Sequence, residues 1–495
     1  MKNKKIIRFV LFMLVITMLL SMFTACKKDG VEENESISTS DIVQDTVATI
    51  ADDVLELPED MNFGGQEVTV LAWSNPECKE FEVDGIGSNS IENSIFLRNN
   101  HLKDRIGINL KYTYIPGAVG DRGEYLKHVE AVISSGDSYD ILAAHTQSIS
   151  LCVVNGYAKN IGKIDDASNN ISLSKKWWNK SLVESCTIGD AVYALTGDIS
   201  TSFVQKLYCL YFNADMLKNK GIESPYDLVE KNQWTLDKLI AMCANLFEDV
   251  NGDTIYDSET DTMALSGRGF DWPAMLHGCD VNFTTKNSSG AIVVDNIGSS
   301  KALDVMDKFQ DLIQRNDATV LNGNVLSTFK DKRLAFYITD TVTASRLGNA
   351  GFEYGCVPVP KYDSSQPNYV TTPRQPITFF CMMNNVPSDR FGMVTATLEA
   401  WAWAGYTCTT PVIFGEVMQY QTSTSTQMSE MLNIIKETVR FDLCRVYNFE
   451  GMNIGNKPGD YLAANKEWSE YVNGDLPRFT SQLSTINSAF AMLDN

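Results

Sequence analysis

The most restrictive feature of the sequence is a regular alternation of strand-like and helix-like segments that begins at residue 66. Residues 66–73, 108–114 and 139–144 are short apolar or alternating runs of the kind that form strands. Between them, residues 90–102 and 125–134 carry apolar side chains at helical spacing. This alternation predicts an α/β fold with a largely parallel sheet. In such a fold, ligands bind beyond the carboxyl ends of the strands.

The N-terminus has the pattern of an export signal. A basic start is followed by an apolar stretch over residues 9–23, shorter than the ~20 residues that a membrane-spanning helix needs. The next residues, Phe23-Thr24-Ala25-Cys26, resemble the bacterial lipobox, with Phe23 where leucine is usual. The resemblance implies that residues 1–25 are a lipoprotein signal peptide and that Cys26 carries the lipid (palmitate). The alternative is an ordinary signal peptide with a chance cysteine.

Residues 26–62 follow as the lipidated cysteine and a disordered acidic tether. Residues 27–60 hold eleven Asp or Glu, two Lys and no aromatic residue, so they cannot bury enough apolar surface to offset their ordering entropy. The predicted location is the extracytoplasmic face of the cell membrane, with the lipid as the only contact to the bilayer, because no second apolar run is long enough to span it.

Charge and residue usage exclude several classes of partner and site. The formal net charge of −21 disfavours nucleic acid and anionic membrane surfaces, both of which bind basic patches. The ten cysteines other than Cys26 form no CxxC pair, and they are interpreted as small buried hydrophobic residues rather than a disulfide framework. The four histidines lack metal-ligand spacing, so a zinc enzyme is not expected.

Motifs in the globular part resemble family 1 extracellular solute-binding proteins, the maltose-binding-protein-like receptors of ABC importers. The matching segments occur in the family's order and extend from residue 66 to about 440. They are residues 189–195 ("G-x-x-Y-x-L", a strand in the family), 210–217 ("YN-x-x-L"), 234–239 ("TWDEL", with Trp and Thr interchanged), 270–273 (Phe-Asp-Trp-Pro), 329–336 ("F-x-x-G-x-x-A-M", with Lys332 for glycine and Phe336 for methionine) and 352–361 ("YG-x-x-P-x-P-K").

The resemblance implies a two-lobed periplasmic-binding-protein-like fold of type II, with lobes joined by hinge strands. Residues 63–197 and 377–435 would form lobe 1, and residues 198–376 and 436–495 would form lobe 2. The chain would cross between lobes near residues 196–200, near 370–377 and around 435. Carbohydrate transport is the implied function: a monomer captures a small-molecule solute, a neutral oligosaccharide, by hinge closure and delivers it to the transmembrane subunits of an ABC permease.

Candidate ligand-binding residues lie at predicted strand ends and at a presumed hinge. Aromatic faces stack on sugar rings, and Asp, Asn, Gln and Arg side chains hold hydroxyl groups. The candidates are Trp73, Asn75, His145, Gln147, Asp198, Trp272, Asp340 and Arg374. For any tryptophan, burial in the core is the more frequent role.

No cofactor is predicted, with calcium as the alternative. Asp249, Asn251, Asp253 and Asp257 resemble positions 1, 3, 5 and 9 of a calcium loop. The loop lacks glycine at position 6, and Thr260 replaces the glutamate of position 12. Asp, Asn and Gly clusters also form ordinary turns, which is the preferred interpretation.

Two other functional classes remain open beside the binding protein. A secreted glycan hydrolase would need two carboxylates ~5–10 Å apart, and 62 acidic residues supply such pairs by chance. No G-x-S-x-G or H-E-x-x-H motif supports another hydrolase, so no enzyme is predicted. A structural or adhesive lipoprotein would be favoured by internal repeats, and the sequence has none.

The lipid anchor yields a direct prediction. Replacing Cys26 by serine removes the thiol that forms the thioether, so the variant should be released into the medium or remain uncleaved. Stable anchoring needs more than one acyl chain, since a single chain binds membranes only marginally. The measurement is detergent partitioning of the wild type and the Cys26→Ser variant. Quantitative recovery of the serine variant with the membrane would contradict the lipoprotein interpretation.

Overall fold

The computed structural model describes residues 54–162, 168–244, 246–253, 260–315, 318–320, 325–348, 350–419, 425–447 and 454–493. Cys26, the signal peptide and most of the tether therefore lie outside the described residues. No helix within the described ranges combines the length and the apolar character that crossing a bilayer requires.

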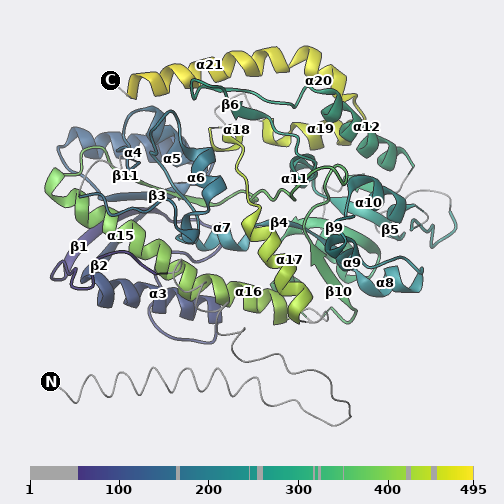
Figure 1. Ribbon diagram of the computed structural model, residues 1–495, viewed down its shortest axis with the longest axis horizontal. Coiled ribbons are helices and arrows are strands. Elements are labelled where there is room, and N and C mark those ends of the chain that lie inside the picture. Colours follow the sequence, from purple (N-terminus) through teal and green to yellow (C-terminus); the bar gives the residue numbers. More distant parts are fainter. Residues whose placement is uncertain are drawn as a thin grey trace, which may run out of the picture. The chain divides into compact units, whose positions relative to one another are not determined.

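The first sheet contains the strands expected from the N-terminal alternation (Figure 1). Its order is β11-β3-β1-β2, with β1 at Gln66–Trp73, β2 at Ile108–Ile115, β3 at Ile141–His145 and β11 at Thr378–Met382. β1 is parallel to β2 and β3, as predicted, whereas β11 runs antiparallel to β3. The exception arises because β11 comes from a distant part of the chain, so no crossover helix fixes its direction.

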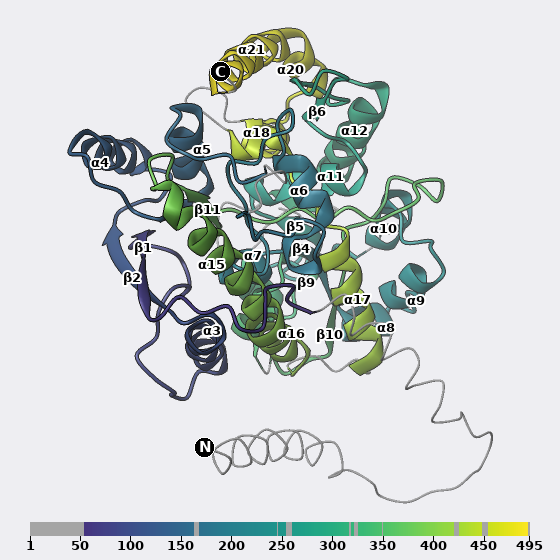
Figure 2. The same cartoon turned by 60° about the vertical axis from the view of Figure 1, so that its left-hand side comes forward.

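The expected helices connect these strands. α3 covers Ser90–Ile106 and α4 covers Arg122–Ser134, each longer than the apolar periodicity indicated. The Asn89 side chain caps α3 by accepting a hydrogen bond from the Glu92 amide, and Gly107 ends the helix with a φ of 66°. Figure 2 shows α4 and α5 (Thr146–Val154) on one side of the first sheet and α3 on the other.

The second sheet is mixed. Its order is β10-β4-β9-β5-β8, with β4 at Tyr208–Asn213, β5 at Met263–Gly267, β8 at Ala318–Val320, β9 at Leu334–Asp340 and β10 at Tyr354–Val357. β5 pairs in parallel with β8 and β9, and β4 pairs antiparallel with β9 and β10. A separate hairpin joins β6 (Thr284–Lys286) and β7 (Ile292–Val294).

The other helices surround the two sheets. Short ones are α6 (Lys180–Cys186), α7 (Thr201–Gln205), α8 (Ala214–Asn219), α9 (Pro225–Glu230), α10 (Leu236–Cys243), α11 (Trp272–Gly278), α13 (Val325–Lys330), α14 (Thr343–Leu347), α18 (Leu443–Val446), α19 (Lys457–Ala463) and α20 (Trp468–Gly474). Longer ones are α12 (Ser300–Gln314), α15 (Phe391–Ala404), α16 (Thr410–Gln419), α17 (Ser425–Glu437) and α21 (Leu476–Leu493). A π-helical turn, η5 (Gly405–Thr409), joins α15 to α16, and the 3₁₀ turns are η2 (Lys176–Trp178), η3 (Gly269–Asp271), η4 (Ser388–Arg390) and η6 (Ile454–Asn456).

One expected strand is absent. Residues 189–195 were predicted as a strand, but they form only isolated bridges, in which Ile188 pairs with Ala191 and Leu195 pairs with Phe380. The amide of Leu195 donates to the Phe380 carbonyl, and the Phe380 amide donates back. The apolar side chains of the segment are buried beside β11. Its composition therefore predicted burial correctly, but the regular hydrogen-bonded ladder of a strand did not form.

The segments between the two sheets lie side by side. Leu207 bridges antiparallel to Pro373, and Thr371 bridges parallel to Val439. These pairings bring together the stretches near 200–208, 370–377 and 438–441. α17 packs on β10 of the second sheet, although the predicted boundary at 435 put most of this helix in lobe 1.

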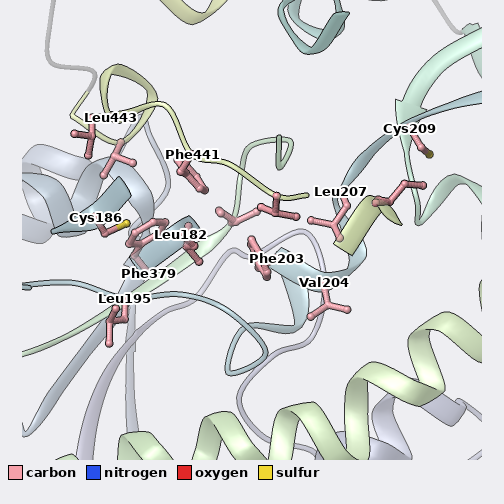
Figure 3. Packing of buried hydrophobic residues seen from close by; sticks show 14 of the residues in the cluster. Leu182, Cys186, Leu195, Phe203, Val204, Leu207, Cys209, Phe379, Phe441 and Leu443 are labelled. Carbon is pink, nitrogen blue, oxygen red and sulfur yellow. The ribbon is translucent and has the colours of Figure 1, made fainter. Parts of the chain in front are cut away.

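A continuous apolar core fills the space around the crossing segments. Figure 3 shows Phe203, Leu207, Phe379 and Phe441 among its members. The ten cysteines outside the N-terminal region are free thiols, and all are buried except Cys78 and Cys408, which are partly buried. This confirms their interpretation as small hydrophobic residues.

Candidate functional site

A cavity of about 550 Å³ lies where the ends of the two sheets meet the crossing segments. Both sheets contribute to its walls, so it corresponds to a cleft between the predicted lobes. The lining residues are Glu77, Ala118, Val119, His145, Gln147, Tyr208, Phe270, Arg374, Gln375, Pro376, Arg445, Gly455 and Asn456.

The fold explains why these side chains converge. His145 is the last residue of β3, and Gln147 lies in the first turn of α5. Phe270 lies in η3, just beyond the carboxyl end of β5, while Arg374 lies on a crossing segment. The cavity thus opens at carboxyl ends of strands, where ligands of α/β proteins bind.

Arg374 organises the charges at the cavity. Its Nη1 atom is 2.9 Å from Asp340 Oδ2 and 3.7 Å from Glu77 Oε2, and its Nε atom is 4.0 Å from Asp271 Oδ1. Lys206 Nζ is 3.0 Å from the same Glu77 oxygen. Burial pushes the pKa of Glu77 upward, but Lys206 and Arg374 outweigh burial and hold this pKa below its usual value.

Phe270 is the exposed aromatic residue of the cavity wall. The residue is 36% exposed, and its ring lies 4.5 Å from the guanidinium carbon of Arg268 and 5.5 Å from that of Arg374. Two guanidinium groups therefore hold the ring in a fixed orientation. The stretch 270–273 was among the predicted motifs, but the larger Trp272 was the candidate chosen within it. Strand-end position and an adjacent polar residue apply equally to Phe270, so the signal was present.

Three further residues of the cavity wall were not predicted from the sequence: Tyr208, Glu77 and Arg445. Tyr208 starts β4, and its hydroxyl lies 3.0 Å from the Phe270 carbonyl and 3.1 Å from Asp271 Oδ1, to one of which it donates. Burial raises the pKa of Asp271, although Arg268 opposes that rise.

Some predicted residues come together at the cavity. His145, Gln147 and Arg374 line it, and Asp340 lies fully buried behind Arg374. His145 Nδ1 accepts the Gln147 backbone N–H at 3.1 Å. Burial, followed by Lys206, lowers the pKa of His145 to about 4, so this imidazole is neutral at pH 7.

Other predicted residues lie elsewhere. The exposed Asn75 side chain donates to Asp121 at 3.1 Å and accepts the Gly117 amide at 3.3 Å, which orders a surface loop. Asp198 is buried, pairs with Lys436 at 3.0 Å and accepts a hydrogen bond from Thr410. Neither side chain lines the cavity.

The two predicted tryptophans are core residues. Trp73 is 1% exposed, and its Nε1 donates to Thr378 Oγ1 at 2.9 Å. Trp272 is 0% exposed and packs edge to face on Phe309 at 5.2 Å. Both were predicted to stack on a sugar ring, and the structure corrects this, because a buried ring cannot contact a solute. The apolar area of an indole favours burial, and both side chains point into packed layers.

The burial of Trp272 predicts a loss of stability on truncation. Trp272→Ala should lower the free energy of unfolding by ~3–5 kcal/mol, because it leaves a cavity in the core. Phe270→Ala is the matched control, since it changes a half-exposed ring two residues away. Urea unfolding measures both variants. Equal stability of Trp272→Ala and the wild type would contradict the core assignment.

The structure describes part of the segment 249–257, for which calcium binding was the alternative to a turn. Asp249 Oδ1 accepts the Gly252 amide at 2.7 Å, and Asn251 Oδ1 accepts the Asp253 amide at 3.0 Å. Asp257 lies outside the described residues. Within the described ranges, no three His, Cys, Asp or Glu side chains gather as a metal site. The hydrogen bonds are those of a turn.

Calcium binding is therefore tested directly. If the loop binds calcium, a chelator should lower the melting temperature of the wild type, because metal binding contributes to folding free energy. Asp253→Ala should abolish that sensitivity. Melting curves of both proteins with and without chelator provide the measurement. Identical curves of the wild type under the two conditions would contradict calcium binding and support the interpretation as a turn.

Comparisons with known proteins identify the fold. No family model matches the chain, and no curated protein matches its sequence. Solved structures match it over most of its length. The sugar-binding protein MalE from Xanthomonas citri aligns with a TM-score of 0.56 at 10% identity, covering 86% of this chain and 99% of its own.

Two further structures agree. A cyclo/maltodextrin-binding protein complexed with maltotetraose aligns with a TM-score of 0.54 at 12% identity, covering 84% of this chain and 97% of its own. The cyclic α-maltosyl-1,6-maltose binding protein from Arthrobacter globiformis aligns with a TM-score of 0.54 at 11% identity, covering 85% and 100%. At such identities the likeness shows the fold, which is the predicted two-lobed substrate-binding fold.

Proposed function

We propose that the protein is an extracellular solute-binding lipoprotein of an ABC importer, which captures an oligosaccharide in the cavity between the sheets. The observation that carries the proposal is the position of that cavity. It is bordered by the ends of both sheets and by the crossing segment at Arg374. Its volume of about 550 Å³ suits a small-molecule ligand.

The solved structures with this fold support the class of solute. They include a protein complexed with maltotetraose and a binding protein for a cyclic maltosyl-maltose. The cavity offers what a sugar requires: an exposed ring at Phe270 and polar side chains at His145, Gln147 and Arg374. Aromatic rings stack on the apolar faces of pyranoses, and the polar groups bind hydroxyls. Asp340 would position Arg374.

Capture would proceed by hinge closure. The paired crossing segments join the two sheets, and one sheet with its helices would rotate about them relative to the other. Closure would bring His145 and Gln147 toward Phe270 and enclose the solute. Lipidation at Cys26 and the tether would keep this monomer at the membrane surface, within reach of the permease subunits.

A glycan hydrolase is the alternative function. It needs one carboxyl group free to protonate a leaving oxygen and a second carboxylate opposite. The carboxylates near the cavity are held by cations, Asp340 by Arg374, Asp271 by Arg268 and Glu77 by Lys206. This arrangement favours binding without hydrolysis. Chromatography of the glycan after incubation separates the two functions, since a hydrolase would release shorter products.

A ligand-array thermal-shift experiment tests the proposal. A bound oligosaccharide stabilises the protein by RT ln(1 + [L]/Kd), so at [L] = 100 Kd the gain is about 2.7 kcal/mol. The proposal would be contradicted if amino acids, peptides or metal ions stabilised the protein and no glycan did.

Phe270→Ala tests the aromatic contact. Loss of the ring should remove ~0.5–1.5 kcal/mol of binding free energy beyond the area term, which by itself weakens the affinity about two- to tenfold. Isothermal titration with the best glycan of the array provides the measurement. Tyr114→Ala is the matched control, because Tyr114 is 43% exposed on β2 and does not line the cavity. Equal affinities of Phe270→Ala and the control would remove Phe270 from the site.

A further inference from the structure

Where the structure describes the chain, each buried arginine except one has a partner for its side chain. Arg98, Arg374 and Arg445 are the buried arginines among the residues described. Arg98 donates to the Glu80 and Phe81 carbonyls at 2.6 and 3.3 Å and lies over the Trp401 ring. Arg374 faces three carboxylates. Such partners are needed because an unpaired buried charge is strongly destabilising.

Arg445 is the exception. It lies on α18, is 8% exposed and forms part of the cavity wall. Its Nη1 atom is buried without a hydrogen-bond partner among the described residues. A guanidinium group carries five N–H donors in a planar fork. Arg445 therefore brings an uncompensated positive charge to the cavity.

Neighbouring side chains give this guanidinium group no direct acceptor. Asp442, the nearest acidic residue along the chain, accepts the Phe283 amide at 2.6 Å and the Cys444 amide at 3.2 Å, so its oxygens are engaged by the backbone. His277 adds no negative charge, and burial lowers its pKa to about 4, which keeps it neutral.

Further donors without acceptors lie beside Arg445. Arg374 Nε and Gln375 Nε2 are buried without hydrogen-bond partners, and both residues line the same cavity. Burial raises the pKa of the Tyr208 hydroxyl, and the positive charges of Arg445 and Arg374 both oppose this rise. The two guanidinium groups therefore lie near the same hydroxyl. Among the described residues of the lining, Glu77 alone carries a carboxylate, and it is already paired with Lys206. Donors therefore exceed acceptors at this end of the cavity, in a chain whose net charge is −21.

From this excess of donors we infer that the cavity binds an acidic glycan, a uronic-acid oligosaccharide whose carboxylate lies between Arg445 and Arg374. The inference rests on the proposed function and narrows its substrate class. A planar carboxylate matches the guanidinium fork in a bidentate geometry, and its single charge balances the one uncompensated arginine. A phosphate ester, with a charge of about −1.5 to −2, would overcompensate it.

The experiment compares acidic glycans with their neutral counterparts. The probes are oligosaccharides of galacturonate, glucuronate, mannuronate and guluronate, each paired with its carboxyl-reduced form. Sulfated glycans and free dicarboxylates form two further arms. Isothermal titration should give at least tenfold tighter binding of one uronate than of its reduced form, because hydrogen bonds to charged groups contribute about 1.5–3 kcal/mol. High salt should weaken only the acidic member.

Arg445→Met then assigns the preference to this residue. The variant should reduce the ratio of acidic to neutral affinity to about one. It should leave the melting temperature of the free protein unchanged or raised, because it removes a buried charge that has no partner. Arg478→Met is the control, since Arg478 is exposed on α21 and does not line the cavity, and it should change neither quantity. A fall in melting temperature with an unchanged affinity ratio would show a structural role for Arg445 and overturn the inference.

These titrations distinguish the failure of the acidic preference from the failure of the proposed oligosaccharide-binding function. Equal or tighter binding of a reduced glycan than of its uronate overturns the acidic preference and leaves the oligosaccharide function standing. Preferential binding of the sulfated arm, or of dicarboxylates without a sugar, likewise overturns the uronate assignment. If no glycan binds, acidic or neutral, the proposed function fails and this inference fails with it.

Discussion

The guanidinium group of Arg374 connects the parts of the structure on which the site depends. It lies on a crossing segment, pairs with Asp340 at the end of β9, and approaches Glu77 in the segment that follows β1. One side chain thus contacts a strand end of the second sheet and a loop of the first. Buried pairs of this kind offset a large desolvation cost only when their geometry is good. The relative position of the two walls of the cavity is accordingly sensitive to this cluster.

Local sequence patterns were sufficient for the framework of the fold. The strands at 66–73 and 108–115 and the helix at 90–106 could be predicted because each displays its own periodicity. The segment 189–195 was predicted wrongly as a strand. Its apolar composition reports burial, while a regular ladder requires a partner strand that the local sequence does not specify.

The site could be predicted less well, for a physical reason. Strand ends located His145 and Gln147, and the crossing segment located Arg374. Whether an aromatic residue lines a cavity or fills the core depends on tertiary packing, so Trp272 was chosen where Phe270 is exposed. Arg445 sits in an ordinary apolar helix, and its lack of a partner is a property of the folded chain alone.

The position of the tryptophans has a spectroscopic consequence. Of the eight tryptophans, all except Trp403 are buried, and none lines the cavity. Apart from that of Trp403, their emission therefore comes from rings that are buried in the folded state. Intrinsic fluorescence of this protein is suited to following unfolding, while occupancy of the cavity would leave the emission wavelength nearly constant. A dye placed at the cavity rim would be the appropriate optical reporter of solute capture.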